Sequence, residues 1–272
     1  MKEDILNIVE SELFYGLDNG VMPVNETSNS VTKIPTFTGS MDPRIMPINN
    51  GRKWDEPFDI EIHGFELVPH KTEMVDFLDT KELKEKYYKE LKTMVKQHVG
   101  ASDIYIFDHT LRTGDDEKRK KELLREPVKR VHNDYTEWSG PQRVRDLFPK
   151  EAEKLISRRF SIIQVWRPIQ KILDKDPLAL CDARSVEESD LIITERRYPD
   201  RVGQTYQIKY NTNHEWFYFP KMTRDEAIIF RVYDSEVDGR ARFTPHTSFI
   251  DPQSTDTANE RESIEVRMMA FF

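Results

Sequence analysis

Three residues in the second half of the chain have types and spacing suited to holding a metal ion. His132 and Asp134 lie two residues apart in VKRVHND (128–134), which we predict to be a strand. Alternation along a strand places both side chains on one face. His246 ends a second predicted strand (241–246), far enough along the chain for other barrel strands to lie between. Two imidazoles and one carboxylate form a facial triad that binds Fe(II) and leaves positions open.

An H-x-D pair alone is weak evidence, because it occurs by chance in many proteins and can be a simple salt-linked pair on a strand. His214 competes with His246 for the third position, but it lies in the turn-like segment NTNHEW, which suits a strand-borne ligand less well. Most of the other histidines need no special role. We therefore predict that the metal ligands are His132, Asp134 and His246.

An arginine and a serine follow the last of these histidines at a spacing that suits a carboxylate. Arg261 and Ser263 share one face of the final predicted strand. A guanidinium pairs with a carboxylate through two hydrogen bonds, and a nearby hydroxyl can add a third. Such a pair inside a barrel would suit the C5 carboxylate of 2-oxoglutarate. An arginine at a strand start is about as often a surface salt bridge, but the ordered set H-x-D, distant His and R-x-S is stronger than its parts.

The elements that must position these residues are strands. After residue 127, short segments rich in β-branched and aromatic residues alternate with turn signals such as YPDRVG and SEVDG. Only two short helices are predicted among them, whereas a parallel α/β sheet needs a helix between successive strands. We therefore expect an all-β core with added helices, arranged as a jelly roll or barrel. The predicted strands are 128–134, 159–168, 190–198, 204–211, 215–219, 227–234, 241–246 and 263–272.

The first half of the chain is expected to add helices and a covering segment. An apolar stripe at spacing four predicts a helix over 80–98. Residues 1–57, which contain NETSNSVTK and several prolines, are predicted to be an irregular N-terminal extension or lid. It would pack on a jelly-roll core with helices over 58–272, so that residues 1–272 form a single catalytic domain. Two further strands are predicted at 59–67 and 103–112.

Composition limits the partners. Lys and Arg number 41 and Asp and Glu number 49, a net charge of −8, which argues against nucleic acid or an anionic membrane as the main partner. No apolar run of about 18 residues exists to span a membrane, and the first residues do not read as a signal peptide. Cys181 is the only cysteine, so no internal disulfide can form. We expect a soluble cytoplasmic protein that acts on a small molecule, and the sequence allows a homodimer.

Several segments make the sequence familiar. It resembles the hydroxylase/desaturase family of non-haem Fe(II)/2-oxoglutarate-dependent oxygenases of specialised metabolism, which includes the cephem 7α-methoxylase component and gibberellin-desaturase-like fungal proteins. The resemblance covers most of residues 103–272, and the first 100 residues show only a general likeness. The matching stretches are VHNDYTEWSGPQRVRDLFP (131–149), IIQVWRPI (162–169), DPLALCDARSVEESDLI (176–192), HEWFYFPKMTRDEAIIFRVYDS (214–235), RFTPHTSFIDP (242–252) and RESIEVR (261–267).

The resemblance implies a fold, cofactors and site residues. The fold would be a double-stranded β-helix, the cupin-like form of the jelly roll. The cofactors would be Fe(II), 2-oxoglutarate as co-substrate and O₂, with iron on His132, Asp134 and His246. The 2-oxoglutarate carboxylate would bind Arg261 or Arg267, and Ser263 favours Arg261.

Six other residues in or near these segments are candidates to bind the substrate. For each aromatic side chain, packing in the core is the more common role. For the arginine, a structural salt bridge is an equal alternative. In IIQVWRPI, a glutamine stands where many relatives are expected to have asparagine. The candidates are Tyr105, Arg112, Gln164, Trp166, Trp216 and Tyr218.

The leading functional hypothesis is an oxidoreductase, a non-haem iron 2-oxoglutarate-dependent dioxygenase. It would hydroxylate, desaturate or oxidatively cyclise a small-molecule intermediate of specialised metabolism, through hydrogen abstraction by Fe(IV)=O. No catalytic residue beyond the metal centre is then required. The alternative is a cupin-type metal-dependent dioxygenase or isomerase that does not use 2-oxoglutarate. A third hypothesis, a non-catalytic jelly-roll binding module, predicts no metal.

Overall fold

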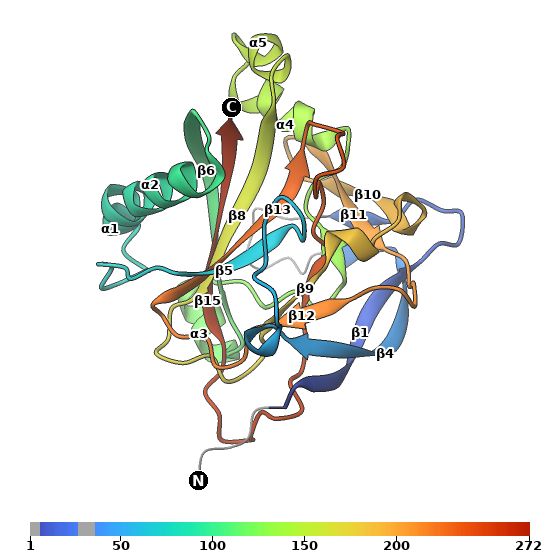
Figure 1. The fold of residues 1–272 in the computed structure, drawn as a ribbon, viewed down its shortest axis with the longest axis vertical. Helices are drawn as coiled ribbons and strands as arrows, with labels where there is room; N and C mark the ends of the chain where they lie inside the picture. Colours follow the sequence, from blue (N-terminus) through green and yellow to red (C-terminus); the bar gives the residue numbers. More distant parts are fainter. Residues whose placement is uncertain (1–5, 27–35) are drawn as a thin grey trace.

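The computed structural model describes residues 6–26 and 36–272, and all of the strands in these ranges belong to two sheets that share one apolar core (Figure 1). The larger sheet is mixed and curled. From edge to edge its ten strands are β1 (Ile8–Leu17), β4 (Ser40–Asn50), β12 (Trp216–Tyr218), β9 (Leu178–Cys181), β14 (His246–Ser248), β7 (His132–Asn133), β11 (Val202–Ile208), β10 (Leu191–Arg197), β2 (Val24–Glu26) and β3 (Thr36–Phe37).

The smaller sheet is antiparallel throughout. Its order is β5 (Phe65–Pro69), β13 (Glu226–Asp234), β8 (Phe160–Pro168), β15 (Glu262–Phe271) and β6 (Asp103–Thr113). Phe160, Ile162 and Phe230 of this sheet pack in one cluster with Leu180 and Phe217 of the larger sheet. The two sheets therefore face each other across a common core, as expected for the predicted jelly roll.

A helical segment covers the outer face of the smaller sheet. It consists of α1 (Thr80–Glu82), one π-helical turn (Leu83–Tyr87) and α2 (Tyr88–Val99), which confirms the predicted helix. Its apolar stripe is fully buried and packs against side chains of β6, β8 and β15. Every residue of β8 is buried, because the helix covers one face and the larger sheet covers the other. In Figure 1 this segment lies beside β6.

The remaining helices are short. They are α3 (Asp116–Glu122), α4 (Ser139–Leu147), α5 (Ala152–Ile156) and the 3-10 turns Gly51–Lys53, Ala183–Ser185 and Glu188–Asp190. Within the described ranges, no helix has the length and apolar character needed to cross a membrane.

The predicted irregular extension over 1–57 is wrong for most of its described residues. β1 and β4 pair along their whole length, from Ile8 opposite Asn49 to Leu17 opposite Ser40. The prolines of β4 led to the wrong prediction, because proline usually interrupts a strand. On the edge of β4 that faces away from β1, only residues 48–50 pair with a neighbour, which is β12. Prolines are tolerated on such a strand edge. Residues 1–5 and 27–35 of the predicted extension lie outside the described residues.

Three predicted strands are shorter than expected. Residues 128–134 contribute only β7, and 241–246 contribute only the first residue of β14. Of 59–67, only 65–67 belong to β5, and the residues before them form a turn. Side chains replace the missing ladder bonds near β7. The amide of Asn133 donates to the carbonyls of Tyr135 and Val232, and its oxygen accepts from the backbone of Thr244. Alternation alone does not reveal such bonding.

Gly64 provides a test of the turn that precedes β5. Its φ is +89°, and an added Cβ would lie 2.3 Å from Oγ1 of Thr244. Gly64→Ala should lower the free energy of unfolding by about 2 kcal/mol or more, from backbone strain plus displacement of Thr244. Gly100→Ala is the matched control, because Gly100 has φ of +68° but open space around it. It should cost about 1 kcal/mol. If urea unfolding gives the same loss of stability for both variants, Thr244 moves aside without a measurable cost.

Candidate metal centre

Two histidines from distant parts of the chain lie directly opposite each other in the larger sheet. β7 pairs with β14 so that His132 faces His246, and the ring centroids are 4.4 Å apart. β7 is held on its other side by β11, where Gln207 is opposite His132. Phe230 of the smaller sheet packs edge-on against His246, 4.8 Å between centroids. The register of three strands thus places both imidazoles at the face between the sheets.

Hydrogen bonds orient both rings in the same way. Nδ1 of His132 lies 2.8 Å from the carbonyl oxygen of Arg130, and Nδ1 of His246 lies 2.9 Å from that of Thr244. A carbonyl only accepts, so each Nδ1 carries the proton and each Nε2 keeps a free lone pair. Burial, followed by the nearby His246, lowers the pKa of His132 to about 3, against the opposing pull of Asp134. The ring of His132 is therefore neutral at neutral pH, as a metal ligand must be.

The carboxylate of Asp134 uses one oxygen for protein contacts and leaves the other open. Gln164 donates to Oδ2 at 2.6 Å, and Nε of Arg267 donates to the same oxygen at 3.1 Å. Oδ1 lies 3.6 Å from Nε2 of His132. Burial opposes ionisation of Asp134, but the charge of Arg267 outweighs it and holds the pKa of Asp134 well below its usual value. Asp134 is therefore a buried anion with a free oxygen.

These three side chains form a donor set that fits a divalent metal ion. One ligand atom from each of His132, Asp134 and His246 lies within 4.8 Å of the others. Two neutral imidazole nitrogens and one carboxylate oxygen suit Fe(II), and the groups that orient them are the supporting contacts typical of metal sites. His214 lies elsewhere, bonded to Asp190 at 3.1 Å and to Tyr15 at 3.3 Å.

The two candidate arginines of the last strand have different surroundings. Arg267 is buried and its guanidinium binds three carboxylates, those of Asp134, Asp108 and Glu265. Despite the opposing effect of burial, these charges raise the pKa of Arg267, led by Glu265. Arg267 thus holds Asp134 in place and is already neutralised by the protein.

Arg261 is equally buried but has only neutral partners among the described residues. Its Nε donates to Ser263 at 2.9 Å, and its Nη1 donates to Ser248 at 3.1 Å and to the carbonyl of Asp176 at 2.9 Å. Burial, and then the charge of Arg112, lower the pKa of Arg261 to about 9. A buried guanidinium without a counter-ion is costly, so this site is suited to an incoming carboxylate.

Three of the predicted substrate residues lie at or beside these polar groups. Gln164 contacts Asp134, as described. The ring of Trp166 lies 5.0 Å from the guanidinium of Arg261, and its Nε1 is buried without a partner. Arg112 is opposite Ser263 in the sheet and donates to the carbonyl of Glu126. Gln164 and Trp166 of β8 therefore lie close to the two buried arginines, Arg267 and Arg261.

The other three predicted substrate residues do not line the pocket beside Asp134. Trp216 donates to Tyr15 and packs with Tyr218 in a cluster between β1, β4 and β9. Both side chains are fully buried in this cluster, which includes Tyr15 of β1 and Ile48 of β4. Tyr105 is 38% exposed and packs on Phe148.

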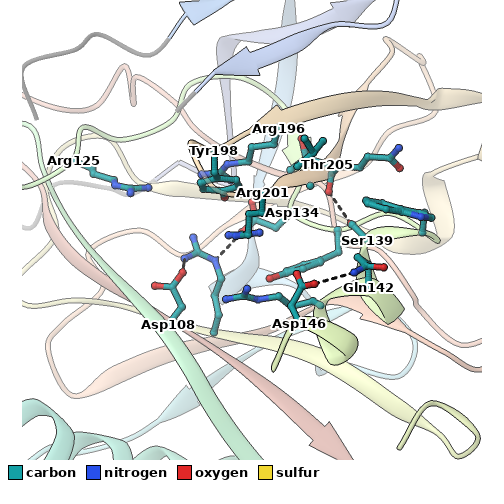
Figure 2. Close-up of a pocket in the computed structure, with 17 residues that line it drawn as sticks. Asp108, Arg125, Asp134, Ser139, Gln142, Asp146, Arg196, Tyr198, Arg201 and Thr205 are labelled. Carbon is teal, nitrogen blue, oxygen red and sulfur yellow. Dashed lines mark hydrogen bonds and ion pairs between the residues drawn. The ribbon is translucent and has the colours of Figure 1, made fainter. Parts of the chain in front are cut away.

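A pocket opens beside Asp134, and the sequence analysis missed most of its wall. Figure 2 shows Arg125, Arg196 and Arg201 to one side of Asp134, and Ser139 and Gln142 to the other. These residues come from α4, from β10 and β11 with the turn between them, and from the segment after α3. These arginines follow no periodic pattern, so only the frequency of arginine in REPVKR (125–130) and RRYPDR (196–201) could have suggested them.

Comparisons with known proteins agree on one family. A family described as oxidoreductase/YMDC permease-like domain matches residues 13–271. The hydroxylase/desaturase CTB9 of Cercospora beticola is 35% identical over 84% of this chain and 76% of its own length. The hydroxylase/desaturase efuI of Hormonema carpetanum is 33% identical, over 83% and 82%. The alpha-ketoglutarate-dependent dioxygenase phiK of a fungal species is 32% identical, over 86% of both chains.

A solved structure shows the same fold. A variant of the iron and alpha-ketoglutarate-dependent endoperoxidase NvfI superposes with a TM-score of 0.86. It is 25% identical and the match covers 98% of each chain. Alpha-ketoglutarate is another name for 2-oxoglutarate.

The contrast between the two buried arginines predicts opposite effects on stability. Arg267→Gln should lower the free energy of unfolding by about 3–5 kcal/mol, because it leaves buried carboxylates unpaired. Arg261→Gln should be nearly neutral or stabilising, because it removes a buried charge with no ion pair. Urea unfolding of metal-free protein at pH 7 measures both. The loss in Arg267→Gln should shrink as pH falls, because Arg267 holds the pKa of Asp134 below its usual value and protonation removes the unpaired charge of this carboxylate. Similar losses in both variants would contradict this assignment.

Proposed function

This chain belongs to the Fe(II)/2-oxoglutarate-dependent hydroxylase and desaturase family, and from that membership we propose how its own residues support an oxidation. We propose that it hydroxylates, desaturates or oxidatively cyclises a small-molecule intermediate of specialised metabolism. The observation that carries the site assignment is the donor set of His132, Asp134 and His246, in which one ligand atom of each residue lies within 4.8 Å of the others. The relatives favour this function over a cupin-type enzyme that does not use 2-oxoglutarate.

Iron and 2-oxoglutarate, when bound, supply the oxidising chemistry, and the protein supplies binding, orientation and exclusion of water. His132, Asp134 and His246 would hold the metal on one face. Arg130 and Thr244 fix the two imidazole tautomers through their carbonyls. No side chain is needed as a nucleophile or general base.

Arg267 and Gln164 would act on the ligand Asp134 rather than on substrate. Both occupy Oδ2, which leaves Oδ1 as the atom available to metal. Arg267 also keeps this buried carboxylate ionised, as the lowered pKa of Asp134 shows. We therefore propose Arg267 as a positioning residue, and not as the partner of 2-oxoglutarate.

Arg261 is the proposed partner for the distal carboxylate of 2-oxoglutarate. It is buried, has no carboxylate partner in the described part of the chain, and is flanked by the hydroxyls of Ser263 and Ser248. The unpartnered Nε1 of Trp166 offers another donor nearby. A dicarboxylate would satisfy groups that the protein leaves unsatisfied.

The expected setting of the enzyme follows from the chain itself. We predict a cytoplasmic enzyme, in which the single thiol, Cys181, is buried and has a pKa raised by that burial. The net charge of −8 disfavours nucleic acid as a partner. A homodimer remains a prediction, and the apolar segments EWFYF and MMAFF do not support it, because they are buried in the core of the single chain except at Glu215 and Phe272.

The ligand assignment predicts which variants lose iron. His132→Ala, Asp134→Ala and His246→Ala should each bind Fe(II) at least about tenfold more weakly, because each removes one of three donors. His214→Ala is the control, since it removes a buried histidine outside the donor set. Metal content after anaerobic loading, normalised to folded protein, is the measurement. Iron loss in His214→Ala with retention in His246→Ala would reverse the assignment.

The co-substrate assignment predicts a spectroscopic change. Anaerobic Fe(II) plus 2-oxoglutarate should give the weak visible absorption band of a keto acid chelated to iron. Arg261→Gln should raise the 2-oxoglutarate concentration needed for half of that band by about a hundredfold, because a buried charge-assisted pair is lost. Ser263→Ala should raise it by less than about tenfold. An unchanged titration in Arg261→Gln would move the co-substrate away from this arginine.

A further inference from the structure

The pocket beside Asp134 is rich in positive charge, although the protein as a whole is acidic. Its wall contains five arginines and three aspartates, whereas the whole chain has a net charge of −8. Asp108 and Asp134 are already bound to Arg267. A local excess of positive charge in a concave site attracts anions. The arginines that remain are Arg125, Arg143, Arg196 and Arg201.

These four arginines make no ion pair with any carboxylate among residues 6–26 and 36–272. Arg196 and Arg201 lie over the ring of Tyr198, with their guanidinium carbons 5.3 and 3.8 Å from its centroid. Arg143 lies over Phe107 at 5.0 Å. Nε of Arg143 and Nε of Arg196 are buried and have no hydrogen-bond partner. Buried donors without acceptors are costly. The unpartnered donors therefore indicate a site for an anion from outside the protein.

Arg125 adds a second sign that an anion is missing. Backbone hydrogen bonds fix the segment of Arg125 beside β6, at the pocket wall. The pKa of Arg125 is lowered, first by loss of water around it and then by the charges of Arg196 and Arg267, with Asp108 opposing. Guanidiniums crowded in this way repel each other unless an anion lies between them.

Part of the remaining wall is apolar and lies among polar side chains such as Gln142 and Gln204. Trp138 and Val202 are about half exposed at the pocket. Tyr135 lies next to Asp134 in the chain and also lines the pocket. In Figure 2, Arg125, Arg196 and Arg201 lie to one side of Asp134, and Ser139 and Gln142 of α4 lie to the other. A ligand anchored at the arginines would therefore have its body against aromatic and aliphatic side chains, close to Asp134.

We propose that this pocket binds the substrate through a carboxylate held by Arg125 and Arg196, so that the substrate is an organic acid with an apolar body. Planar guanidiniums pair well with a planar carboxylate. This inference rests on the proposed function, because Asp134 both borders the pocket and is the proposed iron ligand. It concerns a site separate from Arg261, which is the proposed partner of 2-oxoglutarate.

The test compares a charged probe with its neutral counterpart. Isothermal titration calorimetry on the full-length metal-free protein would use 2-naphthylacetate and 2-naphthylacetamide, which differ in the carboxylate. The acid should bind about tenfold or more tightly than the amide. In the double variant Arg125→Gln with Arg196→Gln, this preference should fall to near one while the affinity for the amide stays unchanged. Unchanged amide binding also shows that the double variant is folded. If the double variant does not fold, the single variants Arg125→Gln and Arg196→Gln are measured in the same way, and each should reduce the preference for the acid.

Two further variants locate the acid. Arg197→Gln makes the same charge change one residue along β10 and does not line the pocket, so the preference should persist. Arg261→Gln should also keep the preference. Loss of the preference in Arg261→Gln would place the acid at the 2-oxoglutarate site and overturn the proposal. Equal affinity of acid and amide, no binding of either, or a preference that survives the double variant would also overturn it.

The outcome separates this inference from the proposed function. The visible band with Fe(II) and 2-oxoglutarate tests the oxygenase assignment without the naphthyl probes. A normal band with no preference for the acid overturns the substrate inference alone. A preference for the acid with no band leaves the anion site standing and removes the oxygenase assignment.

Discussion

The ion pair between Asp134 and Arg267 is the interaction on which the rest of the site depends. Asp134 follows β7 of the larger sheet, and Arg267 belongs to β15 of the smaller one. The side chain of Arg267 therefore contacts Asp134 across the space between the two sheets. A buried carboxylate remains ionised only when an opposite charge compensates for lost water. The same bond selects which carboxylate oxygen is left for a metal, so the packing of the two sheets and the chemistry of the site are coupled.

Two arginines six residues apart, one just before β15 and one within it, illustrate how context decides function. Arg267 is surrounded by carboxylates and is neutralised, whereas Arg261 is surrounded by hydroxyls and a carbonyl. The charge of Arg267 is compensated within the protein, whereas that of Arg261 has no carboxylate partner among the described residues. Unsatisfied buried charges are rare in proteins because they are costly, and they identify places where a ligand completes the structure. The arginines of the pocket beside Asp134 follow the same logic.

The sequence predicted the parts of the fold that repeat and missed those that depend on single contacts. The stripe at Leu83, Tyr87, Leu91 and Val95 and the strands β6, β8, β13 and β15 follow periodic patterns, and the structure contains them. β7 has only two residues because Asn133 replaces strand pairing with side-chain bonds, which no periodicity records. β1 and β4 were missed because prolines usually interrupt strands. The proposed metal ligands were found by residue type and order, whereas the opposite roles of Arg261 and Arg267 depend on neighbours from β6 and on Asp134.

The order of elements along the chain has a consequence for synthesis on the ribosome. β15 is made after every other strand of the two sheets, yet it lies between β8 and β6 and carries the cation that Asp134 requires. A nascent chain that has emerged up to β14 holds His132, Asp134 and His246 but lacks Arg267. Until β15 inserts, β8 has a free edge and Asp134 has no buried counter-charge, so this carboxylate must stay hydrated or protonated. Closure of the smaller sheet and maturation of the metal-binding geometry are therefore a single late event in biogenesis, and a chaperone that shields the open edge of β8 would protect both.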